Sequence, residues 1–168
     1  HKMGIKASAT CVMNYENATG YLIGNEHGGL KAMFTMMNAA RLGVGVEGMA
    51  KASLAYQYAT AYAKDRLQGR ALTGPQEVGK PADSIMVHPD VRKMLLTIRS
   101  FVEGARMLAG YCALTLDIRH KHPDEDARTR AEDIAGLLTP VIKAFFTDEG
   151  FRGASMGMQC YGGHGYIA

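Results

Sequence analysis

Apolar residues recur at three- and four-residue steps from Leu30 to about Arg66, and no proline interrupts them. This spacing places the apolar side chains along one face and predicts a long helix. Gly43, Gly45 and Gly48 lie inside the pattern, and each costs about 1 kcal/mol relative to alanine in a helix interior. Three such costs indicate that the backbone comes close to a neighbour, which is either another helix or a ligand.

A second helical pattern follows a loop that is rich in glycine and proline. It begins at His88-Pro89-Asp90, because proline suits the first turn of a helix, and it runs to about His120. Pro123 then stops it, since the residue before a proline is disfavoured in the helical conformation.

A third helical pattern starts at Asp124 and ends at Gly162-Gly163. Pro140 lies within it and predicts a kink, while residues 147–150 are compatible with either a break or a polar turn. Three long antiparallel helices are the material of an up-and-down helical bundle, so the predicted fold class is mainly α.

Residues 4–23 show a different pattern. Short apolar stretches around residues 10–13 and 21–23 flank turn-forming residues, which favours two short strands or one frayed hairpin. A hairpin alone is marginal in water, so we interpret this β segment as the end of a β domain. The predicted domains are therefore 1–26, the end of that β domain, and 27–168, the helical bundle. Because the first residue is histidine rather than methionine, we expect a processed product or an excised piece.

Composition narrows the functional classes. The chain has 168 residues, of which 47% are hydrophobic and 21% charged, enough to bury a core. Its formal charge is +3 with no block of five like charges, which argues against a nucleic-acid partner. No apolar run is long enough for a membrane span. The three cysteines have no CxxC spacing, so we expect reduced thiols in a cytoplasmic protein.

Several common chemistries lack their motifs. There is no Glu-x-x-His pair for a di-iron site in a bundle and no G-x-S-x-G for a serine hydrolase, and we expect no metal site. The glycines of residues 162–165 follow a helix rather than a strand, which argues against a Rossmann site. This glycine run is compatible with a plain helix cap or with a loop that lets the backbone approach a ligand.

Several segments together resemble the acyl-CoA dehydrogenase family. Gln159-Cys160-Tyr161-Gly162-Gly163-His164-Gly165-Tyr166 resembles its FAD-contacting loop, and residues 62–69 resemble its Tyr-Ala-x-x-Arg segment. Residues 28–30 and 38–41 resemble the start of the first helix of its C-terminal domain, and residues 2–11 and 20–24 the last strands of its middle β domain. Residues 69–95 look most like the methylthiopropanoyl-CoA dehydrogenase branch.

The resemblance implies a flavoenzyme that oxidises an acyl-CoA thioester to the trans-2-enoyl-CoA and passes electrons to an electron-transfer flavoprotein. The whole enzyme is expected to be a homodimer or homotetramer. By position in the family motifs, the residues implied to contact FAD are Arg66, Gln68, His88, Gln159, Gly162 and Gly163. The last three match the loop that contacts the adenosine half of a neighbouring subunit's FAD. Arg66 matches the arginine at the FAD pyrophosphate, where a guanidinium suits phosphate oxygens. The implied acyl-CoA contacts are Asn38 and Arg41.

Two positions depart from the family pattern. Asn38 stands where some members carry aspartate, which puts its contact to CoA in doubt. Ala40 occupies the place where a minority of members carry the catalytic base, and alanine cannot accept a proton. We therefore expect the base after Ala168 and no turnover by this piece alone. The alternatives are an inactive oligomerisation fragment, or the same domain of an acyl-CoA oxidase or a nitroalkane-oxidase-like flavoenzyme.

Overall fold

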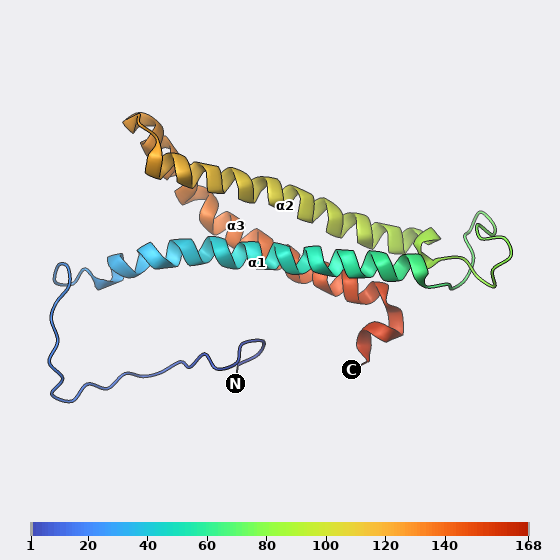
Figure 1. Ribbon diagram of the computed structural model, residues 1–168, viewed down its shortest axis with the longest axis horizontal. Helices are drawn as coiled ribbons and strands as arrows, with labels where there is room; N and C mark the ends of the chain where they lie inside the picture. The colour runs from blue at the N-terminus through green and yellow to red at the C-terminus, as the bar shows by residue number, and fades with distance from the viewer. Residues whose placement is uncertain (1, 168) are drawn as a thin grey trace. The chain divides into compact units, whose positions relative to one another are not determined.

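The computed structural model describes residues 2–167 (Figure 1). His1 and Ala168, the outermost residues of the two predicted domains, lie outside that range. The elements are α1 (Gly29–Asp65), η1 (Ile85–Val87), α2 (Pro89–Lys121), α3 (Glu125–Cys160) and η2 (Gly162–Tyr166). The chain divides into two compact units, with the boundary between Phe34 and Thr35 inside α1. Each unit is described by itself.

The first unit does not form the predicted pair of strands. Between residues 2 and 28 the backbone pairing is a single bridge of Lys2 with Ile5, closed by hydrogen bonds of 3.2 and 3.3 Å. Tyr21 and Ile23, which belong to one of the two apolar stretches predicted as strands, are almost fully exposed. A strand needs a partner backbone and a surface to cover, and the described part of this unit supplies neither. The assignment of residues 1–26 to the end of a β domain stays a prediction.

The second unit confirms the predicted helical fold. In Figure 1, α2 runs antiparallel to α1, and α3 then returns in the direction of α1. The helix ends agree with the sequence signals: Pro89 is the first residue of α2, and the Asp124 side chain caps α3 by accepting a hydrogen bond from the Asp126 amide at 3.2 Å.

Close contact of α1 with α3 explains two of the three glycines in the first helix. A Cβ added at Gly48 would lie 2.6 Å from the Phe146 carbonyl oxygen, and one at Gly45 would lie 3.2 Å from the Ile142 side chain. From the other side, a Cβ added at Gly150 would lie 2.5 Å from the Gly48 carbonyl oxygen. The neighbour predicted for these glycines is therefore another helix. For Gly43 the prediction was wrong, since a Cβ there would meet open space.

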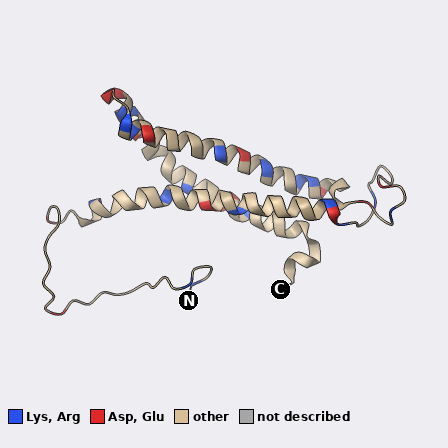
Figure 2. Cartoon of the chain, in the orientation of Figure 1, with Lys and Arg blue, Asp and Glu red and all other residues tan. Residues whose placement is uncertain are grey.

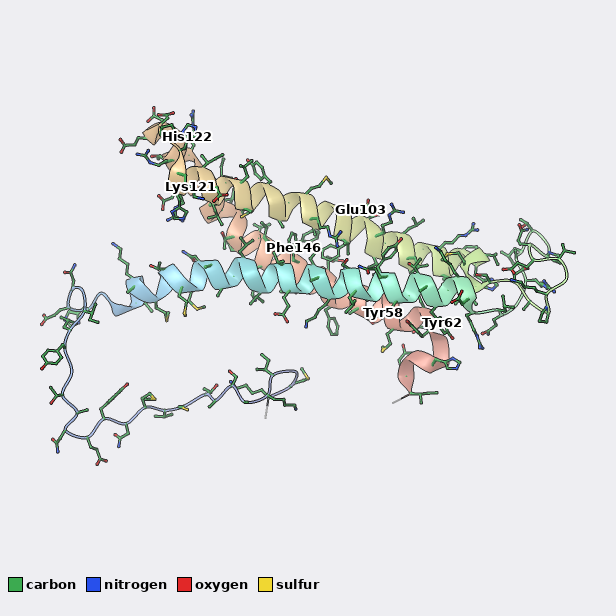
Figure 3. The ribbon with its side chains drawn as sticks, viewed as in Figure 1. Tyr58, Tyr62, Glu103, Lys121, His122 and Phe146 are labelled. Atoms are coloured by element: carbon green, nitrogen blue, oxygen red, sulfur yellow. The ribbon has the colours of Figure 1, made fainter. Side chains whose placement is uncertain are left out.

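The same contact accounts for the continuity of α3. The helix runs without a break through Pro140 and through residues 147–150. Gly150 is buried in it because α1 packs directly on that position. Next to this crossing, the fully buried ring of Phe146 lies among the three helices (Figure 3).

Charged side chains lie mostly away from this core. Figure 2 shows them along α2 and around the connection from α2 to α3. There Arg119 pairs with Glu132 at 2.9 Å, and Arg128 donates to the His122 and Pro123 carbonyl oxygens. Polar contacts thus fasten the connection at this end of the bundle.

Candidate functional site

A pocket of about 750 Å³ opens where α1 and α3 end and α2 begins. Its size falls in the usual range for a small-molecule site. All six residues that the family motifs implied as cofactor contacts line it: Arg66, Gln68, His88, Gln159, Gly162 and Gly163. They come from three separate parts of the chain, and the fold brings them together.

One wall of the pocket is a short two-stranded pairing at the base of a long loop. The Gln68 amide donates to the Asp83 carbonyl oxygen at 2.9 Å, and the Asp83 amide donates to the Gly69 carbonyl oxygen at 2.9 Å. The Ile85 amide donates to the Arg66 carbonyl oxygen, also at 2.9 Å. Gly69 has a φ of +71°, a conformation that favours glycine. The chain therefore leaves α1, makes the 70–82 loop and returns to the same place.

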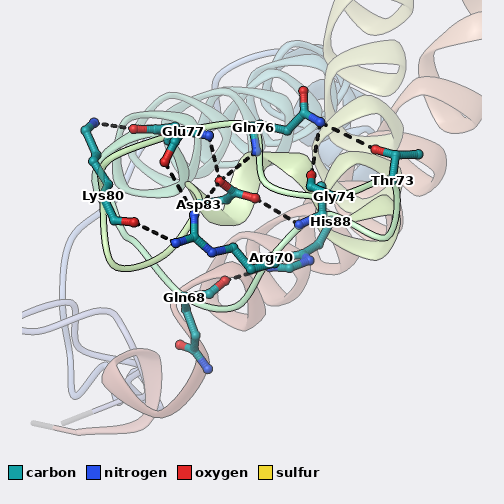
Figure 4. Close-up of polar contacts among 10 residues, drawn as sticks. Gln68, Arg70, Thr73, Gly74, Gln76, Glu77, Lys80, Asp83 and His88 are labelled. Atoms are coloured by element: carbon teal, nitrogen blue, oxygen red, sulfur yellow. Dashed lines mark hydrogen bonds and ion pairs between the residues drawn. The ribbon is translucent and has the colours of Figure 1, made fainter.

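The Asp83 carboxylate organises that loop (Figure 4). It is fully buried and accepts hydrogen bonds from the amides of Ala71 at 3.0 Å, Gln76 at 3.0 Å and Glu77 at 2.8 Å. The Arg70 guanidinium adds an ion pair at 3.2 Å. These donors, the Ala71 amide first among them, hold the pKa of the Asp83 carboxyl well below its ordinary value.

His88 is fixed against the same wall. Its ring Nε2 lies 2.8 Å from the Gln68 carbonyl oxygen. Because a carbonyl oxygen only accepts, Nε2 carries the proton of this hydrogen bond, and Nδ1 is the acceptor nitrogen of the neutral ring. Gly69 is required here as well, since a Cβ would lie 3.3 Å from the His88 ring.

The opposite wall is the turn that follows α3. Gly162 adopts a φ of +58°, and a Cβ at Gly165 would overlap the Met158 carbonyl oxygen, so both positions need glycine. The Tyr166 hydroxyl donates to the Gln159 side-chain oxygen at 2.6 Å, which orients that amide. Added Cβ atoms at Gly162 and Gly163 would meet nothing within 4 Å, so these glycines leave open space beside the backbone.

Aromatic rings join this turn to α1. Tyr62 stacks on Tyr161 with ring centroids 4.3 Å apart, and its hydroxyl lies 3.2 Å from Nδ1 of His164. In Figure 3, Tyr62 lies near the C-terminal end of α1, one turn beyond Tyr58. These contacts connect the glycine turn to the last turns of α1.

The polar lining suits an anionic ligand that also carries neutral hydrogen-bonding groups. Within residues 2–167 the exposed Arg66 guanidinium has no hydrogen-bond or ion-pair partner. Gln68 and Gln159 contribute amides, and His88 and His164 contribute imidazole rings that can form hydrogen bonds. Asp90 is the acidic member of the lining. A guanidinium beside glycine backbone and amides is a donor set that fits phosphates and ribose of a dinucleotide.

Cys160 is the nucleophilic side chain in the lining, and its surroundings make it unreactive. Burial, and next the charge of Asp90, raise the pKa of its thiol. A thiol with a raised pKa has little thiolate at neutral pH. Cys160 belongs to a buried hydrophobic cluster that also includes Ala63 and Val91.

The two implied acyl-CoA contacts lie elsewhere. Asn38 and Arg41 are near the start of α1 and do not line the pocket. The Arg41 guanidinium is 3.5 Å from the Asn38 side-chain oxygen, so the two residues form a local pair. The structure thus brings the implied cofactor residues together, and keeps the implied substrate residues at a separate position on the same helix.

Over the described range, no group of three or more His, Cys, Asp or Glu side chains could hold a metal ion. None of the helices described is long and apolar enough to cross a membrane.

Fold and pocket together define a helical-bundle domain with a ligand-sized site between the ends of its helices. The chain belongs to the acyl-CoA dehydrogenase family. The family's sequence profile, described as "Acyl-CoA dehydrogenase, C-terminal domain", matches residues 27–168.

Curated relatives agree with this assignment. The chain is 47% identical over 167 residues to the 3-methylmercaptopropionyl-CoA dehydrogenase of Ruegeria pomeroyi. It is 35% identical to a broad-specificity linear acyl-CoA dehydrogenase of Mycobacterium tuberculosis and 32% identical to a butyryl-CoA dehydrogenase of Syntrophomonas wolfei. In each case the match covers 99% of this chain and 28% of the relative. The chain therefore spans little more than a quarter of their length.

Asp83 is the pocket-supporting residue to which the sequence patterns assigned no role. It lies in a loop rich in turn-forming residues, where an aspartate that accepts backbone amides is common. Its partners are the backbone amides of positions 71, 76 and 77, and only the folded loop brings these groups together.

Proposed function

We propose that this chain is the helical-bundle part of an FAD-dependent acyl-CoA dehydrogenase, and that its pocket holds the diphosphate and ribose portion of FAD. The observation that carries the proposal is the meeting of all six motif residues in one pocket. Arg66 would pair with the diphosphate, while Gln68, His88 and Gln159 would bind sugar and phosphate oxygens. The open backbone at Gly162 and Gly163 would allow close approach.

The reaction itself needs groups that this chain does not supply. FAD supplies the hydride acceptor for oxidation of an acyl-CoA thioester to the trans-2-enoyl-CoA. Asn38 and Arg41 would contact the acyl-CoA, and the base that removes the α proton would follow Ala168. Electrons would leave to an electron-transfer flavoprotein. This chain's part is to bind and orient, so we predict that it shows no turnover by itself.

Titration with ADP tests the proposed site, because ADP carries the portion of FAD that the pocket would hold. Calorimetry should show binding to the chain, and Arg66→Gln should weaken it by roughly tenfold or more, as expected for the loss of charge-assisted hydrogen bonds. Arg99→Gln is the matched control, since it removes the same charge from an exposed pair with Glu103 on α2. Equal affinity of Arg66→Gln and the unchanged chain would count against the proposal.

A second role is supported by exposed apolar side chains. Met107, Tyr111 and Leu114 are 73%, 51% and 58% exposed, and their spacing places them on one face of α2. Such a face favours a homodimer or homotetramer, which buries it against a second copy. Sedimentation velocity of the chain tests this role, and a strict monomer at all concentrations would contradict it.

An acyl-CoA oxidase or a nitroalkane-oxidase-like enzyme would use the same domain, and the identity of the electron acceptor separates these reactions from a dehydrogenase. We also propose a cytoplasmic protein, because Cys112 and Cys160 are buried free thiols.

A further inference from the structure

We propose that Asp83 is a positioning residue for the cofactor pocket: through the 70–82 loop it sets the Gln68–His88 wall. This inference rests on the proposed function, since it names a residue that acts on the same site without lining it. Asp83 is absent from the pocket lining and is fully buried behind it.

Several hydrogen-bond donors of the loop converge on the Asp83 carboxylate. Three backbone amides and one guanidinium, at 2.8 to 3.2 Å, converge on the two carboxylate oxygens. All four donors belong to the loop itself, at positions 70, 71, 76 and 77. Amides that lose such an acceptor inside a buried site have no water to replace it, so the loop conformation depends on Asp83.

Arg70 provides a second set of contacts within the loop. Its guanidinium donates to the carbonyl oxygens of Glu77 at 3.4 Å and Lys80 at 2.6 Å, in addition to Asp83. Figure 4 shows these contacts converging from both halves of the loop. The Asp83–Arg70 pair therefore joins the outgoing and returning segments of the loop.

Backbone hydrogen bonds lead from Asp83 to the pocket. The backbone of Asp83 is hydrogen-bonded on both sides to the outgoing segment, accepting from Gln68 and donating to Gly69. The Gln68 carbonyl oxygen in turn accepts from the His88 ring at 2.8 Å. A shift of the residue-83 backbone would move the group that fixes the tautomer and orientation of His88.

The test compares Asp83→Asn with a matched control on the same loop. Asparagine keeps the shape of the side chain but replaces an acceptor oxygen with an amide donor, which conflicts with the donors at that position. Glu77→Gln is the control, because it removes only the side-chain ion pair with Lys80 and leaves the Glu77 amide in place. Circular dichroism reports the helices of each variant independently of the loop.

Two measurements report directly on the Gln68–His88 wall of the pocket. For the neutral His88 ring, two-bond proton–nitrogen correlation should show the proton on Nε2, the nitrogen that donates to the Gln68 carbonyl oxygen. We expect Asp83→Asn to lose this single tautomer, while the exposed His120 stays unchanged. Affinity for ADP should fall by roughly fivefold to thirtyfold, the equivalent of one or two misplaced hydrogen bonds. Glu77→Gln should match the unchanged chain in both readouts.

The possible outcomes distinguish the positioning role of Asp83 from the proposed function of the pocket. A His88 tautomer and an ADP affinity that both survive Asp83→Asn in a helical protein would overturn the positioning role. If the unchanged chain does not bind ADP, the proposed function fails, and the His88 spectrum still decides whether Asp83 sets the wall. If Asp83→Asn loses its helices, Arg70→Gln replaces it, with a smaller change of His88 in the same direction expected and no change contradicting the role.

Discussion

The contact of α1 with α3 and the loop beside the pocket both bring backbone segments together, but by opposite means. Gly48 and Gly150 allow two helices to meet because side chains are missing, and no polar side chain is needed there. Asp83 draws the loop together because one side chain supplies the acceptor that several amides need. The helix contact depends on shape, whereas the loop depends on a charge. Mutations and pH should therefore affect the two regions differently.

The largest effect is expected from Gly150→Ala. The new Cβ would lie 2.5 Å from the Gly48 carbonyl oxygen and 2.7 Å from its carbonyl carbon, and backbone atoms cannot turn aside as a flexible side chain can. We expect the free energy of unfolding to fall by about 2–3 kcal/mol, as for overpacked cores. Urea denaturation followed by circular dichroism measures it. An unchanged midpoint would mean that α1 and α3 do not approach as described.

A pH titration should separate the loop from the helices. The folded-state pKa of Asp83 lies below its ordinary value of 3.8, so its stabilising contribution is complete above that value and is lost as pH falls below it. Between about pH 4 and pH 2, the free energy of unfolding should therefore decline less steeply in Asp83→Asn than in the unchanged chain. Acid denaturation series of both proteins test this, and parallel slopes would contradict the assigned contacts.

The smallest effect is expected from Gly136→Ala, which is the counterpart of Gly150→Ala on the same helix. Gly136 lies inside α3 with nothing within 4 Å of an added Cβ. Gly136→Ala should raise the free energy of unfolding by about 0.5–1 kcal/mol, because alanine is the better helix former and meets no obstacle. The same denaturation measurement applies, and opposite signs for positions 136 and 150 would show that space, rather than glycine as such, matters at the crossing.

The two regions also differ in how far the sequence predicted them. Helix ends follow from local chemistry, so Pro89 and Asp124 marked the starts of α2 and α3 correctly. Residues 147–150, which were compatible with a break or a polar turn, continue α3, and Gly150 lies there in close contact with Gly48 of α1. No local pattern contains that neighbour.

The residues around the pocket were also only partly predictable from the sequence. Family motifs selected six residues that the fold does bring together, since such motifs record positions that lie near one another in space. Asp83 was missed because its partners are backbone amides, which carry no residue signature. The predicted strands at residues 4–23 failed for a related reason: pairing needs a partner backbone that the described residues of the first unit do not provide.

The most direct test of the account is where ADP binds on this chain. Amide proton–nitrogen spectra recorded with increasing ADP should shift the signals of Gly69, Gly162 and Gly163 first, with Gly104 on the exposed side of α2 unaffected. Shifts confined to these pocket amides would agree with the account. Shifts that are absent, or that gather away from the pocket, would contradict it.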